Sequence, residues 1–231
     1  SSTGCKGAPL FGPRDATIVM TPADPLYPGA RALQDSIPAV RFGTVVNGCR
    51  MEAKAKCPFV NLSALNLSNV QLPLSDLRGA NVEGANATSL NANFSKASRL
   101  HGAGANFQVA GFAFSDLTDA DLTDAEFSFT AFSFADLDGA NMTGANLAFG
   151  DLSGASLVGA NLSGVNLSDS DAIGADFTNV NFQGANLSDA DFTGADLTNA
   201  LTDTAIFCNT LMPDGSVAAP TKGLCPLQTE P

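Results

Sequence analysis

The sequence predicts an all-β solenoid in which a square coil repeats every twenty residues, and three observations predict it. A central apolar residue, mostly Leu or Phe, recurs at nearly every fifth position from Leu62 to Phe207 without a slip in phase. A small residue, mostly Ala, lies two positions before it, and Asn or Asp lies between them, as in Ala-Asn-Leu-Ser-Gly at 160–164. A period of five is neither that of a helix (3.6) nor that of a flat strand (2.0). The chain must therefore turn a corner every five residues, so that four units close one coil.

The repeated unit resembles the motif of the pentapeptide-repeat family, Ala-(Asp/Asn)-Leu-x-x. The resemblance covers residues 60–207 and implies a right-handed quadrilateral β-helix of about 7.5 coils. At a spacing of about 4.8 Å per coil, the rod would be about 36 Å long. Residues 1–59 then form an irregular N-terminal arm, and residues 208–231 form a short disulfide-linked C-terminal tail.

One coil departs from the pattern, because its four central positions are small: they are Ala87, Ala92, Ala97 and Gly102. Two positions that usually hold Ala have become Leu90 and Leu100. Moving volume from one inward position to the other keeps a core filled. We expect packing compensation here, and a waist or bend in the rod is the alternative.

The N-terminal arm is rich in Pro between residues 9 and 38, with one candidate strand at 16–20 and one candidate helical turn at 29–34. Its net charge is +3, whereas residues 60–207 carry −14. A basic arm beside an acidic rod predicts docking, either on its own rod or on the next one. Neither end of the repeats has a convincing capping helix, so we expect open ends that can stack on another rod.

Five cysteines lie outside the repeats or at their edges. None forms Cys-x-x-Cys, and a single His disfavours a zinc site. Disulfides in an oxidising compartment are therefore the preferred interpretation. We pair Cys49 with Cys57 and Cys208 with Cys225, which leaves Cys5 unpaired or bonded to another chain, although spacing alone does not set the connectivity. Together with a first residue that is Ser rather than Met, as in a processed precursor or a trimmed chain, the cysteines predict export to an extracellular, periplasmic or lumenal location.

The residue before each central position divides the four faces of the coil into two kinds. Two faces carry mainly Asn and two carry mainly Asp: Asn61, Asn81, Asn141, Asn161 and Asn181; Asn66, Asn86, Asn106, Asn146, Asn166 and Asn186; Asp151, Asp171 and Asp191; Asp76, Asp116, Asp136, Asp176 and Asp196. Stacked Asn side chains can hydrogen-bond along a ladder, whereas stacked like charges destabilise neighbouring strands. The Asp faces are either a solvated surface or a candidate site for a basic partner or Ca²⁺.

A second outward column, two residues after the central position, holds apolar side chains where small or polar ones are expected. We call these seven residues the aromatic stripe: Leu74, Phe94, Phe114 and Phe134 on one wall, and Val109, Phe129 and Phe149 on the next. Monomeric soluble proteins rarely expose several hundred Å² of contiguous apolar surface. The stripe is therefore predicted to be covered by protein, either by the chain's own arm or by a neighbouring chain.

Eight Asn-x-Ser/Thr sequons are candidate glycosylation sites: Asn61, Asn66, Asn86, Asn93, Asn141, Asn161, Asn166 and Asn186. Ser or Thr follows the central residue in 7 of 12 units with Asn and in 6 of 9 units with Asp. Because Asp cannot carry this glycan, the sequons are a by-product of the repeat. They would still face outward and be usable wherever a glycosylation pathway exists.

The sequence offers little for catalysis and no cofactor motif. The single His101 occupies an outward repeat position, the Asp residues recur regularly rather than converging, and the Gly residues follow no phosphate-loop pattern. The net charge of −12 disfavours direct nucleic-acid binding. No run of 18 apolar residues is present, so no membrane insertion is expected.

These observations favour a non-enzymatic exported structural protein, whose rods self-associate end to end or through the aromatic stripe and the arm into a fibre or assembly. The family resemblance implies one alternative, an acidic mimic of DNA that binds a type II topoisomerase. A monomeric lumenal or periplasmic binding module is the other.

Overall fold

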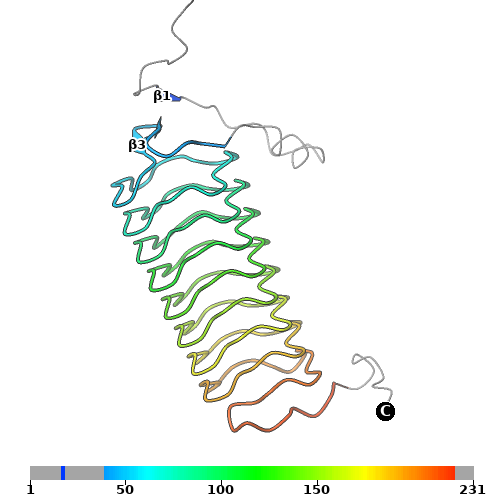
Figure 1. Cartoon of the computed structure of the whole chain (residues 1–231). Coiled ribbons are helices and arrows are strands. Elements are labelled where there is room, and N and C mark those ends of the chain that lie inside the picture. Colours follow the sequence, from blue (N-terminus) through cyan, green and yellow to red (C-terminus); the bar gives the residue numbers. More distant parts are fainter. Residues whose placement is uncertain (1–16, 19–38, 222–231) are drawn as a thin grey trace, which may run out of the picture.

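The computed structural model describes residues 17–18 and 39–221, and residues 39–221 form a straight stack of coils (Figure 1). Residues twenty apart pair in parallel, from Lys56 with Asp76 to Asp191 with Leu211. Each coil is therefore four sides long, and each side contributes one bridge residue. The predicted repeat, 60–207, lies within this paired region.

Each side of a coil is a short extended segment followed by a tight turn. The Leu117 N–H donates to the Asp136 carbonyl of the next coil at 2.7 Å, and the Ala120 N–H closes the turn by donating to the Leu117 carbonyl at 3.1 Å. The second residue inside that turn, Asp119, has a φ of +56°. A positive φ at this position is the signature of a type II turn, which favours Gly or Asn. Each five-residue unit thus contains one bridge residue, two residues whose side chains point into the core, and two residues that form the turn at the corner.

The core is made by the two inward residues of each unit. Its largest fully buried side chains include seven Phe: Phe107, Phe112, Phe127, Phe132, Phe177, Phe182 and Phe192. Rings one coil apart stack in parallel, as Phe107 does on Phe127 with centroids 4.9 Å apart. Rings on adjacent sides meet edge to face, as for Phe127 and Phe132 at 5.1 Å. Both arrangements are favourable for aromatic pairs.

The coil with small central residues is filled by its compensating side chains. Leu90 and Leu100 point inward and are at most 4% exposed. A Cβ added at Gly102 would meet Leu122 at 3.0 Å and the Phe107 ring at 3.3 Å, so larger neighbours occupy its space. The bridges continue through this coil without interruption. Packing compensation accounts for the departure from the pattern.

A small sheet covers the N-terminal end of the rod, which corrects the expectation that this end is open. Strands β2 (Val45–Val46) and β3 (Cys49–Arg50) form an antiparallel hairpin, and β1 (Thr17–Ile18), inside the candidate strand at 16–20, pairs with β2 in parallel. Asn47 and Gly48 make the hairpin turn with φ values of +49° and +82°, as a two-residue type I′ turn requires. The core therefore extends to Val46, which the sequence placed in the arm.

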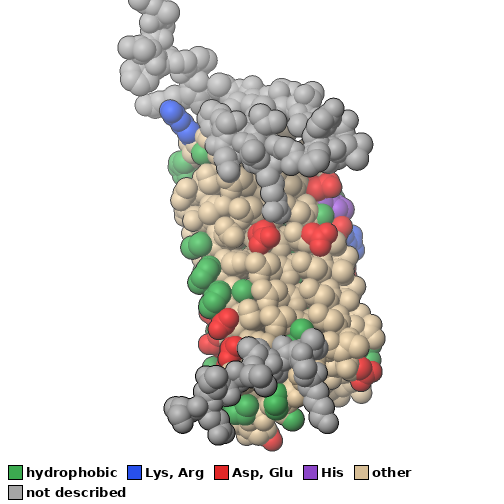
Figure 2. Space-filling model, turned by 90° about the vertical axis from the view of Figure 1, so that its right-hand side faces the viewer, with side chains coloured by type: hydrophobic (Ala, Val, Ile, Leu, Met, Phe, Trp, Pro, Cys, Tyr) green, Lys and Arg blue, Asp and Glu red, His purple; other side chains and the backbone are tan. Residues whose placement is uncertain are grey.

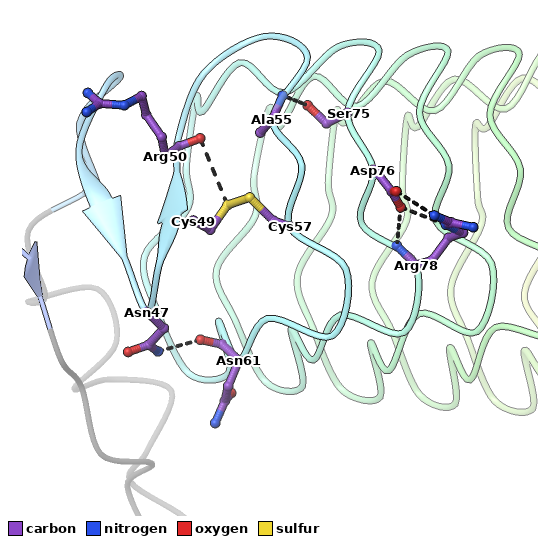
Figure 3. The surroundings of a disulfide bond; sticks show 9 residues. All are labelled: Asn47, Cys49, Arg50, Ala55, Cys57, Asn61, Ser75, Asp76 and Arg78. Atoms are coloured by element: carbon purple, nitrogen blue, oxygen red, sulfur yellow. Dashed lines mark hydrogen bonds and ion pairs between the residues drawn. A yellow bond between two sulfur atoms is a disulfide. The ribbon is translucent and has the colours of Figure 1, made fainter.

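The hairpin is tied to the first coil by the predicted Cys49–Cys57 disulfide, whose sulfur atoms lie 2.01 Å apart (Figure 3). At the turn of the hairpin, the Asn47 side-chain amide donates to the Asn61 carbonyl at 2.6 Å. These two links hold β2 and β3 over the buried apolar residues of the first coil.

At the C-terminal end, the chain folds back along part of the last coil. Leu211 pairs with Val217 in an antiparallel bridge, and the Ala218 N–H donates to the Thr210 carbonyl at 2.8 Å. Cys208 is disulfide-bonded, and its predicted partner, Cys225, lies outside the described residues. Cys5 and the candidate helical turn at 29–34 also lie outside them.

Candidate association surface

The aromatic stripe is exposed over its whole length. The exposed fractions of its seven residues run from 50% to 59%: Leu74, Phe94, Phe114, Phe134, Val109, Phe129 and Phe149. In the view of Figure 2, hydrophobic side chains follow one another along one edge of the rod. Because half of a Phe side chain is on the order of 100 Å², the stripe presents several hundred Å². That area is at the upper end of what a monomer leaves bare.

The rings of the stripe stack on one another along the rod axis. The Phe94 and Phe114 centroids lie 5.1 Å apart with planes 4° from parallel, and the Phe114–Phe134 and Phe129–Phe149 pairs are similar at 5.1 and 4.9 Å. Phe114 therefore has a ring on both faces, and each of the other four Phe residues has a ring on one face. Such a ridge suits packing against another apolar surface.

Every residue of the stripe occupies a corner position with positive φ. The values lie between +56° and +61°, including +59° at the β-branched Val109. This conformation costs about 1–2 kcal/mol for a non-Gly residue, and a stacked aromatic pair contributes about 0.5–1.5 kcal/mol. In the same columns other coils hold Gly154, Gly174 and Asp169, residues that suit the corner. The stripe thus places bulky apolar side chains at corners where Gly, Asn or Asp would cost the single chain less.

The two columns of the stripe border one side of the rod, and small residues lie between the columns on two coils, with the Asn93 side chain over Gly111. Val109 and Phe114 stand at the two ends of one coil side, with Gly111 and Ala113 exposed in part between them. Ala131 follows Gly111 on the next coil. This group of residues was not predicted, although columns of residues twenty apart in the sequence reveal it. An approaching surface could therefore contact both columns and the strands between them.

Among the described residues, two further exposed Phe lie outside the stripe. Phe59 is 79% exposed and its ring covers Gly79, and Phe42 in the N-terminal end is 67% exposed. The exposure of Phe59 was not predicted, although this residue occupies the same corner position as the stripe residues. Its column continues with Gly79 and Arg99, so it does not extend into an apolar ridge.

The predicted Asn ladders are present. The Asn181 amide donates to the Asn161 Oδ1 at 3.2 Å, and the Asn186 amide donates to the Asn166 Oδ1 at 3.0 Å. Each Oδ1 also accepts the backbone N–H two residues ahead, from Ser163 and from Ser168, both at 3.2 Å. These bonds stabilise the coil stacking and occupy the Asn amides.

The sequons arise from the same turn chemistry. The Ser188 hydroxyl donates to the Asn186 Oδ1 at 2.7 Å, and the Thr118 hydroxyl donates to the Asp116 Oδ1 at 2.8 Å. Asn and Asp accept the hydroxyl in the same way, which explains why Ser and Thr follow both with similar frequency. Glycosylation at the eight sequons stays a prediction.

The Asp faces form columns, as predicted, and their charges are only partly compensated. Arg78 forms an ion pair with Asp76 at 2.6 Å and lowers the pKa of that carboxyl through its hydrogen bond. Lower in the same column, burial raises the pKa of Asp136, and the like charges of Asp138 and Asp116 add to that rise. Ionisation of the Asp136 carboxyl therefore lowers the stability of the folded chain.

We predict that Asp136→Asn stabilises the fold at pH 7. The folded state holds the Asp136 proton to higher pH than the unfolded state, whose reference pKa is 3.8, so stability falls as pH rises through that pKa and the raised folded one. The Asn side chain can still accept the Asp138 N–H that now bonds to Asp136 at 3.2 Å. We expect a gain of a few tenths to about 1 kcal/mol, as for a relieved like-charge pair between strands. Thermal unfolding should show the gain at pH 7 and not at pH 3. An equal gain at both pH values would contradict this explanation.

Metal binding finds no geometric support in the part of the chain that the structure describes. Among residues 17–18 and 39–221, no group of three or more His, Cys, Asp or Glu is placed to hold a metal ion, so the candidate Ca²⁺ site on the Asp faces has no assembled ligand set there. His101 is exposed on the repeat surface. Within the same residues, no helix is long and apolar enough to cross a membrane.

Comparison with known proteins agrees with this geometry. The family model for pentapeptide repeats matches eight copies, over residues 55–89, 105–144, 125–164 and 160–199, which is more than half of the chain. The chain belongs to the pentapeptide repeat family. Its fold is accordingly the right-handed quadrilateral β-helix of that family.

Several solved pentapeptide repeat proteins are similar to this chain. Rfr23 from the cyanobacterium Cyanothece 51142 is 30% identical over 37% of this chain and 58% of its own, with a TM-score of 0.37. A protein from the thylakoid lumen of Arabidopsis thaliana is 34% identical over 38% of this chain and 61% of its own, with a TM-score of 0.37. HetL from Nostoc sp. PCC 7120, a protein involved in heterocyst differentiation regulation, is 26% identical over 69% of this chain and 92% of its own, with a TM-score of 0.28. This chain thus spans just over half the length of Rfr23. No curated protein sequence matches it.

Proposed function

We propose that this chain is a non-enzymatic structural protein whose rods associate with one another through the aromatic stripe. The observation that carries the proposal is the conformation of the stripe: seven exposed apolar residues, all at positive φ, stand in two columns that border one side of the rod. Contact with another apolar surface would bury these side chains and offset the strain that the single chain bears.

We further propose that the protein is exported. The Cys49–Cys57 disulfide supports an oxidising compartment, and it joins the N-terminal hairpin to the first coil, where it has a structural role. End-to-end stacking, the other route to a fibre, is less favoured at the N-terminal end because β1, β2 and β3 cover it.

The test removes the stripe without straining the fold. Phe114→Gly/Phe134→Gly places at these corners the residue that the same column already has at 154, 174 and 194, so we expect an intact rod. Sedimentation velocity over a concentration series, without reductant, should show oligomers for the natural chain and a shift of at least 100-fold toward dissociation for the variant. This shift corresponds to the loss of about 2.7 kcal/mol of binding free energy.

The matched control is Asn179→Gly/Asn199→Gly, which makes the same kind of change at corner positions outside the stripe. It should associate as the natural chain does. A natural chain that sediments as a monomer at every concentration would overturn the proposal and favour a monomeric lumenal or periplasmic binding module. Unchanged oligomers in the Phe114→Gly/Phe134→Gly variant would show that association uses another surface.

One observation favours a second candidate function, an acidic mimic of DNA that binds a type II topoisomerase. Residues 100–221 carry sixteen Asp or Glu and no Lys or Arg, and their columns repeat at regular intervals along the rod. Inhibition of gyrase supercoiling by the purified chain, lost when Asp116, Asp136 and Asp176 are replaced by Asn, would support it. No inhibition at micromolar protein would exclude it.

A further inference from the structure

Charge is distributed unevenly along the rod axis. Residues 39–99 carry seven Lys or Arg and three Asp or Glu, a net charge of +4, whereas residues 100–221 carry a net charge of −16. The first coils and the N-terminal hairpin are therefore a basic end, and the remaining coils are acidic. When two rods pack side by side, either the two basic ends lie next to each other or each basic end lies next to an acidic half.

The basic end has charges available for a partner. Lys54, Lys56 and Lys96 are exposed and form no ion pair among the described residues, unlike Arg78, which is bound to Asp76. Lys56 and Lys96 lie in one column with Asp76 between them. Lys54 stands in the same corner column as Leu74, because its N–H donates to the Pro73 carbonyl as the Leu74 N–H donates to the Asn93 carbonyl, both at 2.9 Å.

In this corner column the Phe residues are centred on Phe114, with Phe94 one coil before it and Phe134 one coil after it. From the basic end it reads Lys54, Leu74, Phe94, Phe114, Phe134, Gly154 and Gly174. A two-fold axis across Phe114 would place the Phe94 ring of one rod opposite Phe134 of the other, and Leu74 opposite Gly154. It would also bring Lys54 level with Gly174, where Asp171 and Asp176 occupy the strand positions on either side of the corner.

We propose that the partner of the stripe is a second copy of this chain, packed side by side in antiparallel orientation, with the basic end of each rod against the acidic half of the other. The inference rests on the proposed function and adds to it the orientation and the charged contacts. The exposed area of the stripe alone is smaller than the area of about 800 Å² that each partner buries in an interface of standard size. Contacts between Lys54 or Lys56 and Asp171 or Asp176, one set at each end of the pair, extend the interface on both sides of the apolar centre.

Two other arrangements, a parallel pair and an end-to-end stack, are less favourable. A parallel pair would set +4 beside +4 and −16 beside −16, and like-charge juxtaposition across an interface costs several kcal/mol. An end-to-end stack would match the charges but would leave the stripe bare. The antiparallel pair is the arrangement that covers the stripe and pairs the opposite ends.

Zero-length cross-linking with a water-soluble carbodiimide, which couples a Lys amine to a carboxyl group, tests the orientation on the natural chain. Lys54 and Asp171 are six coils apart in one rod, about 29 Å at 4.8 Å per coil, so an amide between them must join two chains. Mass spectrometry of the cross-linked dimer should find Lys54 or Lys56 joined to Asp171 or Asp176. The same products should disappear at dilutions where the protein is monomeric.

Lys54→Arg/Lys56→Arg is the matched control: it keeps both charges, so it should dimerise with unchanged affinity, yet it has no amine to couple at these positions. A dimer in which Lys54 and Lys56 are joined only to carboxyls of the first coils, or only to Asp203 or Asp214 of the last coil, would overturn the antiparallel orientation and leave the proposed function standing. A chain that forms no dimer would overturn both.

Discussion

Phe127→Ala is expected to lower the free energy of unfolding by about 3–5 kcal/mol, as large-to-small changes of buried aromatic residues do. Phe127 is fully buried. Its ring stacks on Phe107 with centroids 4.9 Å apart and meets Phe132 at 5.1 Å, so the truncation removes contacts with the coil above and with the adjacent side of the same coil. Because a solenoid is stabilised by contacts between neighbouring coils, the loss should weaken the middle of the rod most. Denaturant unfolding of the purified variant measures it.

The matched control lies two residues further on. Phe129 belongs to the same coil but is 59% exposed at a φ of +60°, so Phe129→Ala should change the stability of dilute, monomeric protein by less than about 1 kcal/mol. Similar losses at both positions would contradict the assignment of one ring to the core and the other to the surface.

Replacing the Cys49–Cys57 disulfide is expected to open the N-terminal end of the rod. The bond closes a loop with a sequence separation of 8, and the chain-entropy estimate for such a loop is about 2.5 kcal/mol. In Cys49→Ala/Cys57→Ala, hydrogen exchange should accelerate by about 50-fold or more at the amides of residues 45–65. The Ala side chains avoid placing a new hydroxyl in the buried positions that both Cys residues occupy.

The far coils are the internal control for this variant. Amides between residues 141 and 186 should exchange as in the natural chain, because nearest-neighbour coupling confines the change to the first coils. Acceleration along the whole rod would show that the coils open together and that the hairpin β2–β3 is not a local cap. Unchanged exchange at 45–65 would show that the hairpin is held without the disulfide.

Most of the fold could be predicted from the sequence because a strict period translates directly into columns. The five-residue repeat continues without a break from Leu62 to Phe207, so every outward residue lies next to the residues twenty positions before and after it. The bridges between Asn161 and Asn181 and between Asp116 and Asp136 are examples. The exposure of the stripe follows for the same reason. Period and composition also predicted the compensation by Leu90 and Leu100.

The N-terminal hairpin escaped prediction because it lies outside the repeat, where no period is available. A local signal was present: Asn47-Gly48 between the apolar residues Val46 and Cys49 is a strong hairpin turn sequence.

The strain at the stripe was also missed, because the sequence shows which residues occupy a corner but not their φ angles. Gly154 and Gly174 in the column of Phe114 were the available hint. Recognising them as corner residues that need a positive φ would have marked each Phe in that column as an exception.

Hydroxyl-radical footprinting of the natural chain tests the central claim, burial of the stripe by association, most directly. Radicals modify exposed rings, so oxidation can be measured by mass spectrometry at each Phe in dilute and in concentrated samples. We expect oxidation of Phe94, Phe114, Phe129, Phe134 and Phe149 to fall as the concentration rises, while Phe59, 79% exposed and outside the stripe, stays unchanged as the internal reference. Equal oxidation of the five stripe rings at all concentrations, in a sample that sediments as an oligomer, would contradict the claim.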